Sequence, residues 1–458
     1  MTTSFLDHLS ASLPAGTLLL GNDIGARYHC DWTGRNPFPP IAVARPASTD
    51  EAATILRLCH AAGQPVVVQG GLTGLAGGAT PRGGELALSL ERLNGVESID
   101  VAGGTMRVGA GTPLAVVHAA AESVGLQFPL DLGARGSCTI GGNISTNAGG
   151  NRVIRYGMAR DLILGIEAVL ADGTVVSSLN SMLKNNAGYD LKHLFIGSEG
   201  TLGVVTRAVL RLHASPRERL TAFVAVDSFE ALVALLGAVR RGLGGQLSSF
   251  ETMWSNYYEF AFRALAPGPR PFAEAHSHYA LIEMEALEPH ADMARLESLL
   301  ADVLSAGIAA DAVLAHSLAE ADRLWLIRDS AGQLIPTLKN PISFDVSMPI
   351  AEMAAYLDAV ENRVAPILSA QPVWVFGHLG DGNLHVITSL EDPADAPAAD
   401  RAVYEPLAGF GSVSAEHGIG VIKRDWLHAS RNEAERALMR QLKTTMDPKG
   451  ILNPGRVL

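Results

Sequence analysis

The chain lacks the features that commit a protein to a membrane, to an oxidising compartment or to a disulfide scaffold. It has three cysteines, Cys30, Cys59 and Cys138, and no two of them have C-x-x-C spacing. This usage is typical of a reduced compartment, so we expect a cytoplasmic protein. No apolar run reaches the roughly 18 residues of a membrane span. The N-terminus also lacks the basic and apolar regions of a secretory signal.

Positive charge is scarce as well. Against 47 Asp and Glu the chain has 35 Lys and Arg, which gives a net charge of −12. An acidic surface repels nucleic acid and anionic membranes, so we expect neither as the main partner. Hydrophobic residues, by contrast, make up 48% of the 458 residues, enough for a sizeable core and two or three domains.

Glycine is concentrated at residues 132–150, LGARGSCTIGGNISTNAGG. Short hydroxyl and amide side chains lie between the glycines, and apolar segments flank the stretch on both sides. Glycine allows a backbone to approach a ligand closely, and the polar groups add hydrogen-bond donors. The stretch therefore predicts a long buried ligand that is rich in acceptors, phosphates included. A flexible surface loop is the alternative of equal weight.

Two further glycine stretches favour the ligand. Residues 66–80 read VVVQGGLTGLAGGAT, and residues 197–203 read GSEGTLG. Neither is a phosphate loop that ends in Gly-Lys-Ser/Thr, and neither has the G-x-G-x-x-G spacing of a dinucleotide fingerprint. Three such stretches, separated by ordinary α/β sequence, predict one extended ligand that is contacted at three places.

The hydrophobic periodicity predicts an α/β region followed by an α+β region with an antiparallel sheet and helices on one face. Ser48 or Asp50 is expected to cap one helix, Thr112 is expected to cap another, and Asp172-Gly173 is expected to turn a hairpin. The expected strands are 41–45, 66–68, 106–108, 163–170, 174–177, 221–226 and 279–285, and the expected helices are 50–62, 113–124, 229–239 and 291–304.

The most informative local geometry is in residues 373–387, VWVFGHLGDGNLHVI. If Asp381-Gly382 forms a two-residue turn, His378 pairs directly with His385. Both side chains would then lie on one face with Cβ atoms ~4.5–5.5 Å apart, which suits two imidazoles that share a metal ion. The alternative is two ordinary core histidines, and the spacing favours the metal.

A third ligand is available in residues 413–420, VSAEHGIG. Glu416 would complete a set of two histidines and one carboxylate, which leaves metal positions open for a substrate. His417 would then be available for another role. Taken alone, these two residues favour a solvated Glu-His pair near a turn.

The ordered motifs resemble those of FAD-binding oxidoreductases of the vanillyl-alcohol-oxidase type. The resemblance rests on the glycine stretches, on KNNAGYDLKHLFIGSEGTLGVVT at residues 184–206 and on DPKGILNPGRVL at residues 447–458. The branch of glycolate oxidase, D-lactate dehydrogenase and D-2-hydroxyglutarate dehydrogenase fits best. The implied fold is α+β, with an FAD-binding domain of two α/β subdomains at 1–215 (leader at 1–36), a substrate or cap domain with an antiparallel sheet at 216–410, and a segment at 411–458 that returns to the FAD domain.

The resemblance also implies a cofactor site. Some relatives bind the flavin covalently through a histidine in the first glycine loop, but residues 65–80 contain no histidine, so we expect non-covalent FAD. The residues expected to bind FAD are Gly70, Gly71, Leu72, Thr73, Gly74, Leu75, Leu132, Gly133, Ser137, Cys138, Thr139, Gly141, Gly142, Asn143, Ser145, Thr146, Gly149, Glu199, Gly200, Gly203, Val205 and Asn453.

In the hydroxyacid dehydrogenases, the positions of His378, His385 and Glu416 hold the metal, and the position of His417 is the base. The resemblance therefore implies that a divalent metal, for which Zn²⁺ is expected, binds a small D-2-hydroxy acid while His417 takes the hydroxyl proton and a hydride passes to the flavin. Arg328 would bind a carboxylate. The electron acceptor is left open between an electron-transfer flavoprotein, a quinone and a cytochrome, and a homodimer is also left open.

Three departures concern the substrate. D-2-hydroxyglutarate dehydrogenases align a lysine with Ser343, a threonine near Gly332 and an asparagine near Ile387. A lost polar contact of this kind costs about 1–3 kcal/mol, so we expect a substrate that is less acidic or more apolar than 2-hydroxyglutarate. Lys339 could compensate, and Asn383 is assigned to the substrate together with Arg328.

Two other functions stay open from the sequence. One is a metal-free flavin alcohol oxidase that uses O₂. The other is a catalytically silent flavin-binding subunit of a larger oxidase.

Overall fold

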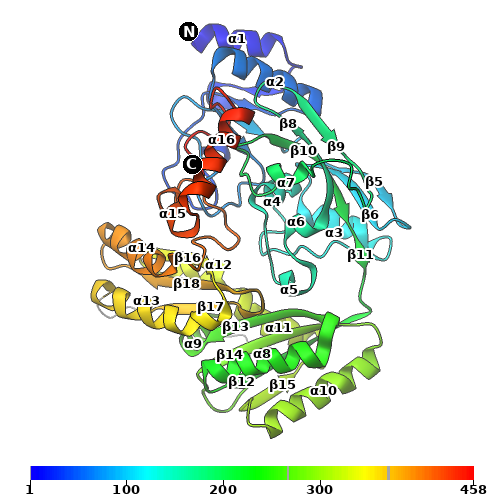
Figure 1. Ribbon diagram of the computed structural model, residues 1–458, viewed down its shortest axis with the longest axis vertical. Helices are drawn as coiled ribbons and strands as arrows, with labels where there is room; N and C mark the ends of the chain where they lie inside the picture. The colour runs from blue at the N-terminus through cyan, green and yellow to red at the C-terminus, as the bar shows by residue number, and fades with distance from the viewer. Residues whose placement is uncertain (1, 266–267, 369–371) are drawn as a thin grey trace. The chain divides into compact units, whose positions relative to one another are not determined.

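The computed structural model describes residues 2–265, 268–368 and 372–458, and the chain divides into two compact units. The first unit consists of Met1–Gly150, Gly157–Ser215 and Glu416–Leu458, and the second of Asn151–Tyr156 and Pro216–Ala415. The first unit is therefore built from both ends of the chain, coloured blue and red in Figure 1.

Two sheets form the framework of the first unit. A four-stranded sheet has the order β1-β2-β4-β3, in which β2, β4 and β3 run parallel. A five-stranded antiparallel sheet has the order β5-β6-β10-β8-β9. The strands are β1 Leu18–Leu19, β2 Val43–Ala44, β3 Val66–Gln69, β4 Leu86–Ser89, β5 Val96–Asp100, β6 Thr105–Gly109, β8 Ile163–Val169, β9 Val175–Ser178 and β10 Val204–Arg211, and a separate pair is β7 Leu126–Gln127 with β11 His213–Ala214.

The helices of this unit connect and flank those strands (Figure 1). They are α1 Thr2–Ala11, α2 Thr49–Ala62, α3 Leu114–Glu122, α4 Ile140–Thr146, α6 Ala159–Leu162, α7 Lys192–Phe195, α15 Leu427–Ser430 and α16 Glu433–Met446.

Local sequence signals decided several of these boundaries. The cap of α2 is confirmed, because Ser48 Oγ accepts from the Glu51 amide at 3.2 Å. The β8–β9 hairpin is confirmed, with Val169 paired to Val175. The cap at Thr112 is wrong: α3 begins at Leu114 after Pro113, and the Thr112 hydroxyl instead donates to the Gly109 carbonyl at 2.7 Å. That hydroxyl closes the turn between β6 and α3, so it is not available for the helix.

The C-terminal segment completes the first unit by pairing with β3. Val66 N donates to Ile451 O at 2.8 Å, and Asn453 N donates to Val66 O at 2.8 Å. Arg456 is 2% exposed and reaches the carboxylate of Glu85 and the carbonyl of Thr80. The last residues thus contribute backbone pairing and a buried ion pair.

The second unit is organised around one seven-stranded, wholly antiparallel sheet with the order β15-β12-β14-β13-β17-β18-β16. Its strands are β12 Glu218–Val226, β13 Leu247–Trp254, β14 His278–Ala286, β15 Asp311–Leu314, β16 Pro341–Ser347, β17 Trp374–His378 and β18 Asn383–Ser389. Its helices are α5 Val153–Tyr156, α8 Phe229–Leu243, α9 Ser255–Leu265, α10 Pro289–Ser305, α11 Leu318–Asp329, α12 Ala331–Leu334, α13 Met353–Leu368 and α14 Ala396–Tyr404.

Helices cover both faces of this sheet, so the expectation of helices on one face is wrong. Phe223 and Ala225 of β12 belong to a buried cluster with residues of α9 and α11. Ala222 and Val224 point to the opposite face and are also 0% exposed, and α8 and α10 contact the same central strands (Figure 1). Successive side chains of a strand point to opposite faces, and here both sets are apolar, so each face needs a cover of its own.

In the described part of the chain, every helix is too short or too polar to cross a lipid bilayer. The cytoplasmic location stays a prediction.

Arg456→Met is expected to lower the free energy of unfolding of the first unit by about 3–5 kcal/mol, because it leaves the buried Glu85 carboxylate without its partner. Urea unfolding followed by circular dichroism measures the change. Arg440→Met is the control, since Arg440 pairs with Glu433 at the surface and its loss should hardly matter. Equal small effects of both substitutions would contradict the prediction.

Candidate active site

The first two glycine stretches pack against each other in the first unit. A Cβ atom at Gly71 would lie 2.0 Å from Ser137 O, and one at Gly70 would lie 2.7 Å from Thr139 Oγ1. At Gly71 glycine is needed because the backbone of Ser137 and Cys138 passes there, and a larger side chain would push the two stretches apart. At Gly70 the close neighbour is the Thr139 hydroxyl. The sequence had suggested only a close approach to a ligand.

The third stretch joins them through backbone contacts. Glu199 N donates to Ser145 O at 2.8 Å, which fixes the third stretch against the second. Asn453 accepts from Val68 N at 2.8 Å and donates to Glu199 O at 2.6 Å, which fixes it against β3. The three stretches therefore meet around the C-terminal segment, as one ligand contacted at three places would require.

Two hydroxyl groups in these stretches have no hydrogen-bond partner in the described structure, although they are buried. Thr139 precedes α4 without capping it, and its Oγ1 atom is unsatisfied; the Oγ of Ser198 is unsatisfied in the same way. A buried polar group without a partner costs free energy, so a ligand that supplies acceptors or donors fits here. FAD, with its phosphates, ribityl hydroxyls and ring carbonyls, meets this requirement.

The other residues expected at the cofactor lie on the same three stretches or next to them. Leu72 has a left-handed backbone with φ of 59°, and Asn143 donates to Cys138 Sγ at 3.6 Å. The remaining residues are Thr73, Gly74, Leu75, Leu132, Gly133, Gly141, Gly142, Thr146, Gly149, Gly200, Gly203 and Val205.

Glu199 has a second role in the first unit. Its carboxylate accepts from the amides of Ile419 at 2.7 Å and Gly420 at 2.8 Å. Burial raises the pKa of this carboxyl, although the two amide donors oppose the shift. Glu199 thus holds the backbone that follows His417, and Val421 N donates to Ala76 O at 2.9 Å next to it.

In the second unit the histidine hairpin has a different register from the predicted one. His378 pairs with Asn383 and Phe376 pairs with His385, because Leu379–Asp381 form a 3₁₀ turn and Gly382 is left-handed. Direct pairing of the two histidines is therefore wrong. A shift of pairing by two positions keeps both side chains on the same face. Their rings are diagonal neighbours with centroids 5.5 Å apart.

His378 lies against a buried ion pair that the sequence did not reveal. Glu251 of β13 is 1% exposed, and its Oε1 lies 2.9 Å from His378 Nδ1. Arg328 of α11 lies 2.6 Å from Glu251 Oε2 and 2.9 Å from His378 Nε2 through its NH2 group. Burial alone would raise the pKa of the Glu251 carboxyl, but Arg328 and His378 outweigh it, and the pKa is lowered.

His385 has an acidic neighbour on the adjacent strand. Asp345 of β16 pairs with His385, and its Oδ1 lies 4.0 Å from His385 Nδ1. Asn383 donates to the same carboxylate at 2.9 Å. Of the two histidines, only His385 belongs to a group of candidate metal ligands in the described part of the chain, and Asp345 is the member of that group in the same unit.

Glu416 and His417 offer a second pair of ligand atoms, which lie within 4.8 Å of each other in the first unit. Their place in the chain is informative. The amide of Ala415, the preceding residue, donates to Asp345 Oδ2 at 3.1 Å, and Ser412 forms a β-bridge with Ser347. One peptide bond therefore joins Glu416 to a residue that is bound to Asp345.

The remaining residues assigned to the substrate have different surroundings. Arg328 is buried, whereas the side chain of Lys339 is exposed. Ser343 is exposed on β16 and pairs with Ile387, which packs in the apolar cluster with Trp374. Beyond His385, the sheet therefore presents an apolar side chain, Ile387, on β18 and an uncharged polar one, Ser343, on β16.

Sequence reasoning missed Glu251 and Asp345, although a signal was present. Each is a single acid inside an otherwise apolar or hydroxylic strand, FETM and SFDVS. Acidic residues are almost never fully buried unless they are paired. A lone carboxylate on a strand that must be buried therefore indicates a partner, here Arg328 for Glu251.

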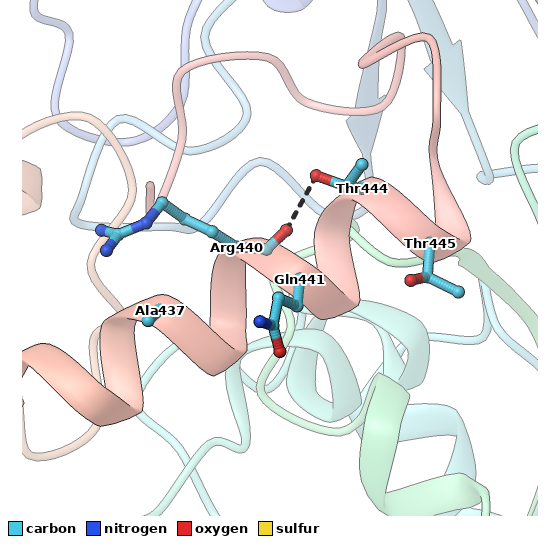
Figure 2. Close-up of a pocket in the computed structure, with 5 residues that line it drawn as sticks. All are labelled: Ala437, Arg440, Gln441, Thr444 and Thr445. Atoms are coloured by element: carbon cyan, nitrogen blue, oxygen red, sulfur yellow. Dashed lines mark hydrogen bonds between the residues drawn. The ribbon is translucent and has the colours of Figure 1, made fainter.

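A shallow hollow elsewhere on the first unit carries no such groups. Figure 2 shows it along α16, lined by Ala437, Arg440, Gln441, Thr444 and Thr445. Thr444 Oγ1 donates to the Arg440 carbonyl of its own helix at 2.9 Å. All five residues come from one exposed helix, so the hollow is not a candidate for the predicted cofactor.

Comparison with protein families matches both parts of the chain. Residues 40–178 match the FAD binding domain, and residues 215–457 match the C-terminal domain of FAD linked oxidases. The second match alone covers more than half of the chain.

Curated relatives match over nearly the whole length. The chain is 41% identical to a D-2-hydroxyglutarate dehydrogenase of Xanthomonas citri pv. viticola, over 94% of this chain and 92% of that protein. It is 40% identical to the mitochondrial D-2-hydroxyglutarate dehydrogenase of Bos taurus, over 93% of this chain and 78% of that protein.

Among solved structures, p-cresol methylhydroxylase with bound substrate has the same fold. It matches with a TM-score of 0.79 and 16% identity, over 100% of this chain and 96% of that chain. With its two FAD-oxidase domains, its full-length relatives and this fold, the chain belongs to the FAD-linked oxidoreductases of the vanillyl-alcohol-oxidase type, in the branch that contains the D-2-hydroxyglutarate dehydrogenases.

Proposed function

We propose that the chain oxidises a D-2-hydroxy acid to the 2-oxo acid, with non-covalently bound FAD as the oxidant and a divalent metal, Zn²⁺, at the substrate. The observation that carries the proposal is the arrangement of the second unit's sheet, where His378, His385, Asp345 and Arg328 gather around two neighbouring hairpin strands. The names of the relatives support a 2-hydroxy acid as the substrate class.

The donor set fits a zinc site. His378, His385 and Glu416 would hold the ion, since imidazole nitrogen and carboxylate oxygen are the ligands of catalytic zinc, and three protein ligands leave a position for substrate. Asp345 is the carboxylate beside His385, the kind of neighbour that orients a metal-bound histidine. Glu416 directly follows Ala415, whose amide donates to Asp345 Oδ2.

Different residues of the chain would bind the substrate and remove its proton. Arg328 offers guanidinium N–H groups to the substrate carboxylate, and His417 takes the hydroxyl proton as general base. Bound Zn²⁺ would lower the pKa of that hydroxyl, and bound FAD would accept the hydride from the substrate carbon. Glu199 holds the backbone after His417 and so limits where the imidazole can lie.

The substrate's distal group would meet an uncharged surface. Ser343 and Ile387 pair across β16 and β18 on the face that carries His385, and neither has a positive charge to form an ion pair with a second carboxylate. The exposed side chain of Lys339 is not directed there by any contact of the described structure. We therefore favour a monocarboxylate such as D-lactate over D-2-hydroxyglutarate, the substrate in the relatives' names.

Anaerobic mixing of the yellow protein with a panel of D- and L-2-hydroxy acids tests the function. Bleaching of the flavin by a D-acid, and its loss after treatment with a chelator and recovery with Zn²⁺, is the expected result. Bleaching that is insensitive to the chelator, with peroxide released in air, would support the metal-free oxidase. No bleaching by any hydroxy acid would support the silent subunit.

His417→Ala is expected to slow flavin reduction by the best hydroxy acid about 10²–10⁴-fold, because a positioned general base contributes that much. Stopped-flow absorbance of the flavin measures the rate, and FAD content should stay unchanged. His428→Ala is the matched control, since His428 is exposed on α15 and contacts the Asp425 carbonyl and the Trp426 ring of its own segment. Near-normal reduction after His417→Ala would remove His417 from the role of base.

Ser343→Lys is expected to raise kcat/KM for D-2-hydroxyglutarate relative to D-lactate about tenfold, because a new charged hydrogen bond contributes about 1.5–3 kcal/mol. Steady-state reduction of an artificial dye with each acid measures the ratio. Lys339→Ala should leave the ratio unchanged. A fall in D-2-hydroxyglutarate activity after Lys339→Ala would show that Lys339 serves the distal carboxylate.

Thr139→Val is expected to weaken FAD binding about two- to tenfold, the equivalent of one hydrogen bond, without destabilising the FAD-free protein. Removing a hydroxyl that has no partner costs the free protein nothing. Fluorescence titration of FAD and thermal unfolding of the apoprotein measure the two effects. Thr112→Val should leave FAD binding unchanged but destabilise the apoprotein, because the Thr112 hydroxyl already donates to Gly109 O.

A further inference from the structure

We propose that Glu251 is a positioning residue that orients His378 and Arg328 together, so that retention of the metal and binding of the substrate carboxylate depend on one buried side chain. The inference rests on the proposed function, in which His378 holds the metal and Arg328 binds the substrate. Glu251 itself contacts neither the metal nor the substrate in this proposal, and it acts through His378 and Arg328.

The carboxylate of Glu251 is saturated by groups of the second unit. One oxygen, Oε1, lies 2.9 Å from His378 Nδ1 and accepts from Ser249 Oγ at 2.8 Å. The other oxygen, Oε2, accepts from Arg328 Nε at 2.7 Å. β13 places this side chain on the inner face of the sheet, next to β17, which carries His378. The two oxygens thus serve two different partners.

The contact with His378 sets which ring nitrogen can bind a metal. A carboxylate that is paired with a guanidinium accepts hydrogen bonds, so Nδ1 of His378 carries the proton and Nε2 keeps its lone pair. A histidine that binds a metal through one nitrogen commonly donates the other N–H to a carboxylate in this way. In the structure, that lone pair accepts from Arg328 NH2 at 2.9 Å, so a metal at Nε2 would replace this contact while Arg328 stays held by Glu251 through Nε.

The contact with Arg328 fixes the plane of the guanidinium. Nε and NH2 face Glu251, NH1 lies 3.3 Å from Asp329 Oδ1, and the group lies over the Phe376 ring with 5.4 Å from Cζ to the centroid. Tyr257 donates to the backbone carbonyl of Arg328 at 3.2 Å, which holds the end of α11 in place. Contacts at the edge of the guanidinium, with Glu251, and at its face, with Phe376, leave it one orientation in which to bind a further carboxylate.

Glu251→Gln tests the proposal because glutamine has the same shape but one acceptor oxygen and one NH₂ group. It can accept from His378 or from Arg328, and the other partner then faces a donor. Zn²⁺ affinity, measured by competition with a chromophoric chelator, is expected to fall about 10–100-fold, as for other outer partners of metal-bound histidines. The Kd of oxalate, a dicarboxylate that has no C–H hydride to transfer, is read from the flavin absorbance and is expected to rise about tenfold.

Glu285→Gln is the matched control, because Glu285 is also 1% exposed on the same sheet but pairs with Arg155 at 3.3 Å. It should move neither the Zn²⁺ nor the oxalate measurement, whatever it does to thermal stability. Equal losses in both variants, or Zn²⁺ and oxalate constants of Glu251→Gln within twofold of the unchanged protein, would overturn the proposal.

Ser249→Ala tests the same role of Glu251 if the Glu251→Gln protein does not fold with bound FAD. It removes one hydrogen bond to Glu251 Oε1 and is expected to shift both constants two- to threefold in the same direction. The proposal would be overturned if Ser249→Ala shifted neither constant. It would also be overturned if the protein without any substitution bound neither Zn²⁺ nor oxalate. If hydroxy acids do not bleach the flavin but Glu251→Gln still weakens both probes, the proposed function fails and the role of Glu251 stands.

Discussion

Charges taken out of water must be paired, and this constraint organises both units. In the second unit Glu251 and Arg328 meet at 2.6 Å with the carboxylate 1% exposed, and His378 lies against the pair. In the first unit Arg456 and Glu85 form another buried pair at the end of the chain. Such pairs add little net stability, but removing one partner is costly, so they allow few alternative arrangements of the residues around them.

The pairing has a chemical consequence in the second unit. The Glu251 carboxylate fixes the plane of the Arg328 guanidinium, and His378, which donates from Nδ1, accepts from that guanidinium at Nε2. The sheet supplies this geometry because β13 and β17 are neighbours and α11 covers the same face. Residues from widely separated parts of the chain therefore bring a carboxylate, an imidazole and a guanidinium into contact.

In the first unit, a second constraint is the close packing of the three glycine stretches. Gly71 passes Ser137 where no Cβ atom fits, and Asn453 connects the third stretch to β3. Close approach between backbones leaves few side chains to fill the space and leaves the Thr139 hydroxyl without a partner. A flavin-sized ligand with many polar atoms resolves both features at once.

The sequence alone determined the family, the mixed α+β class and the positions of several helices and strands, because caps, turn residues and apolar periodicity are local signals. Ser48 and Asp172-Gly173 acted as predicted. It also placed His378 and His385 on one face, since a register shift of two leaves the face unchanged.

Only the tertiary structure decided what those histidines touch. The turn at Leu379–Asp381 moved the pairing, and Glu251 lies 127 positions from His378 in the chain, so no local pattern connects them. The closeness of Gly71 to Ser137 and the burial of Arg328 likewise arise from packing between distant segments. Spacing along a chain predicts the face of a strand, but the partner across that face depends on how distant strands and helices pack.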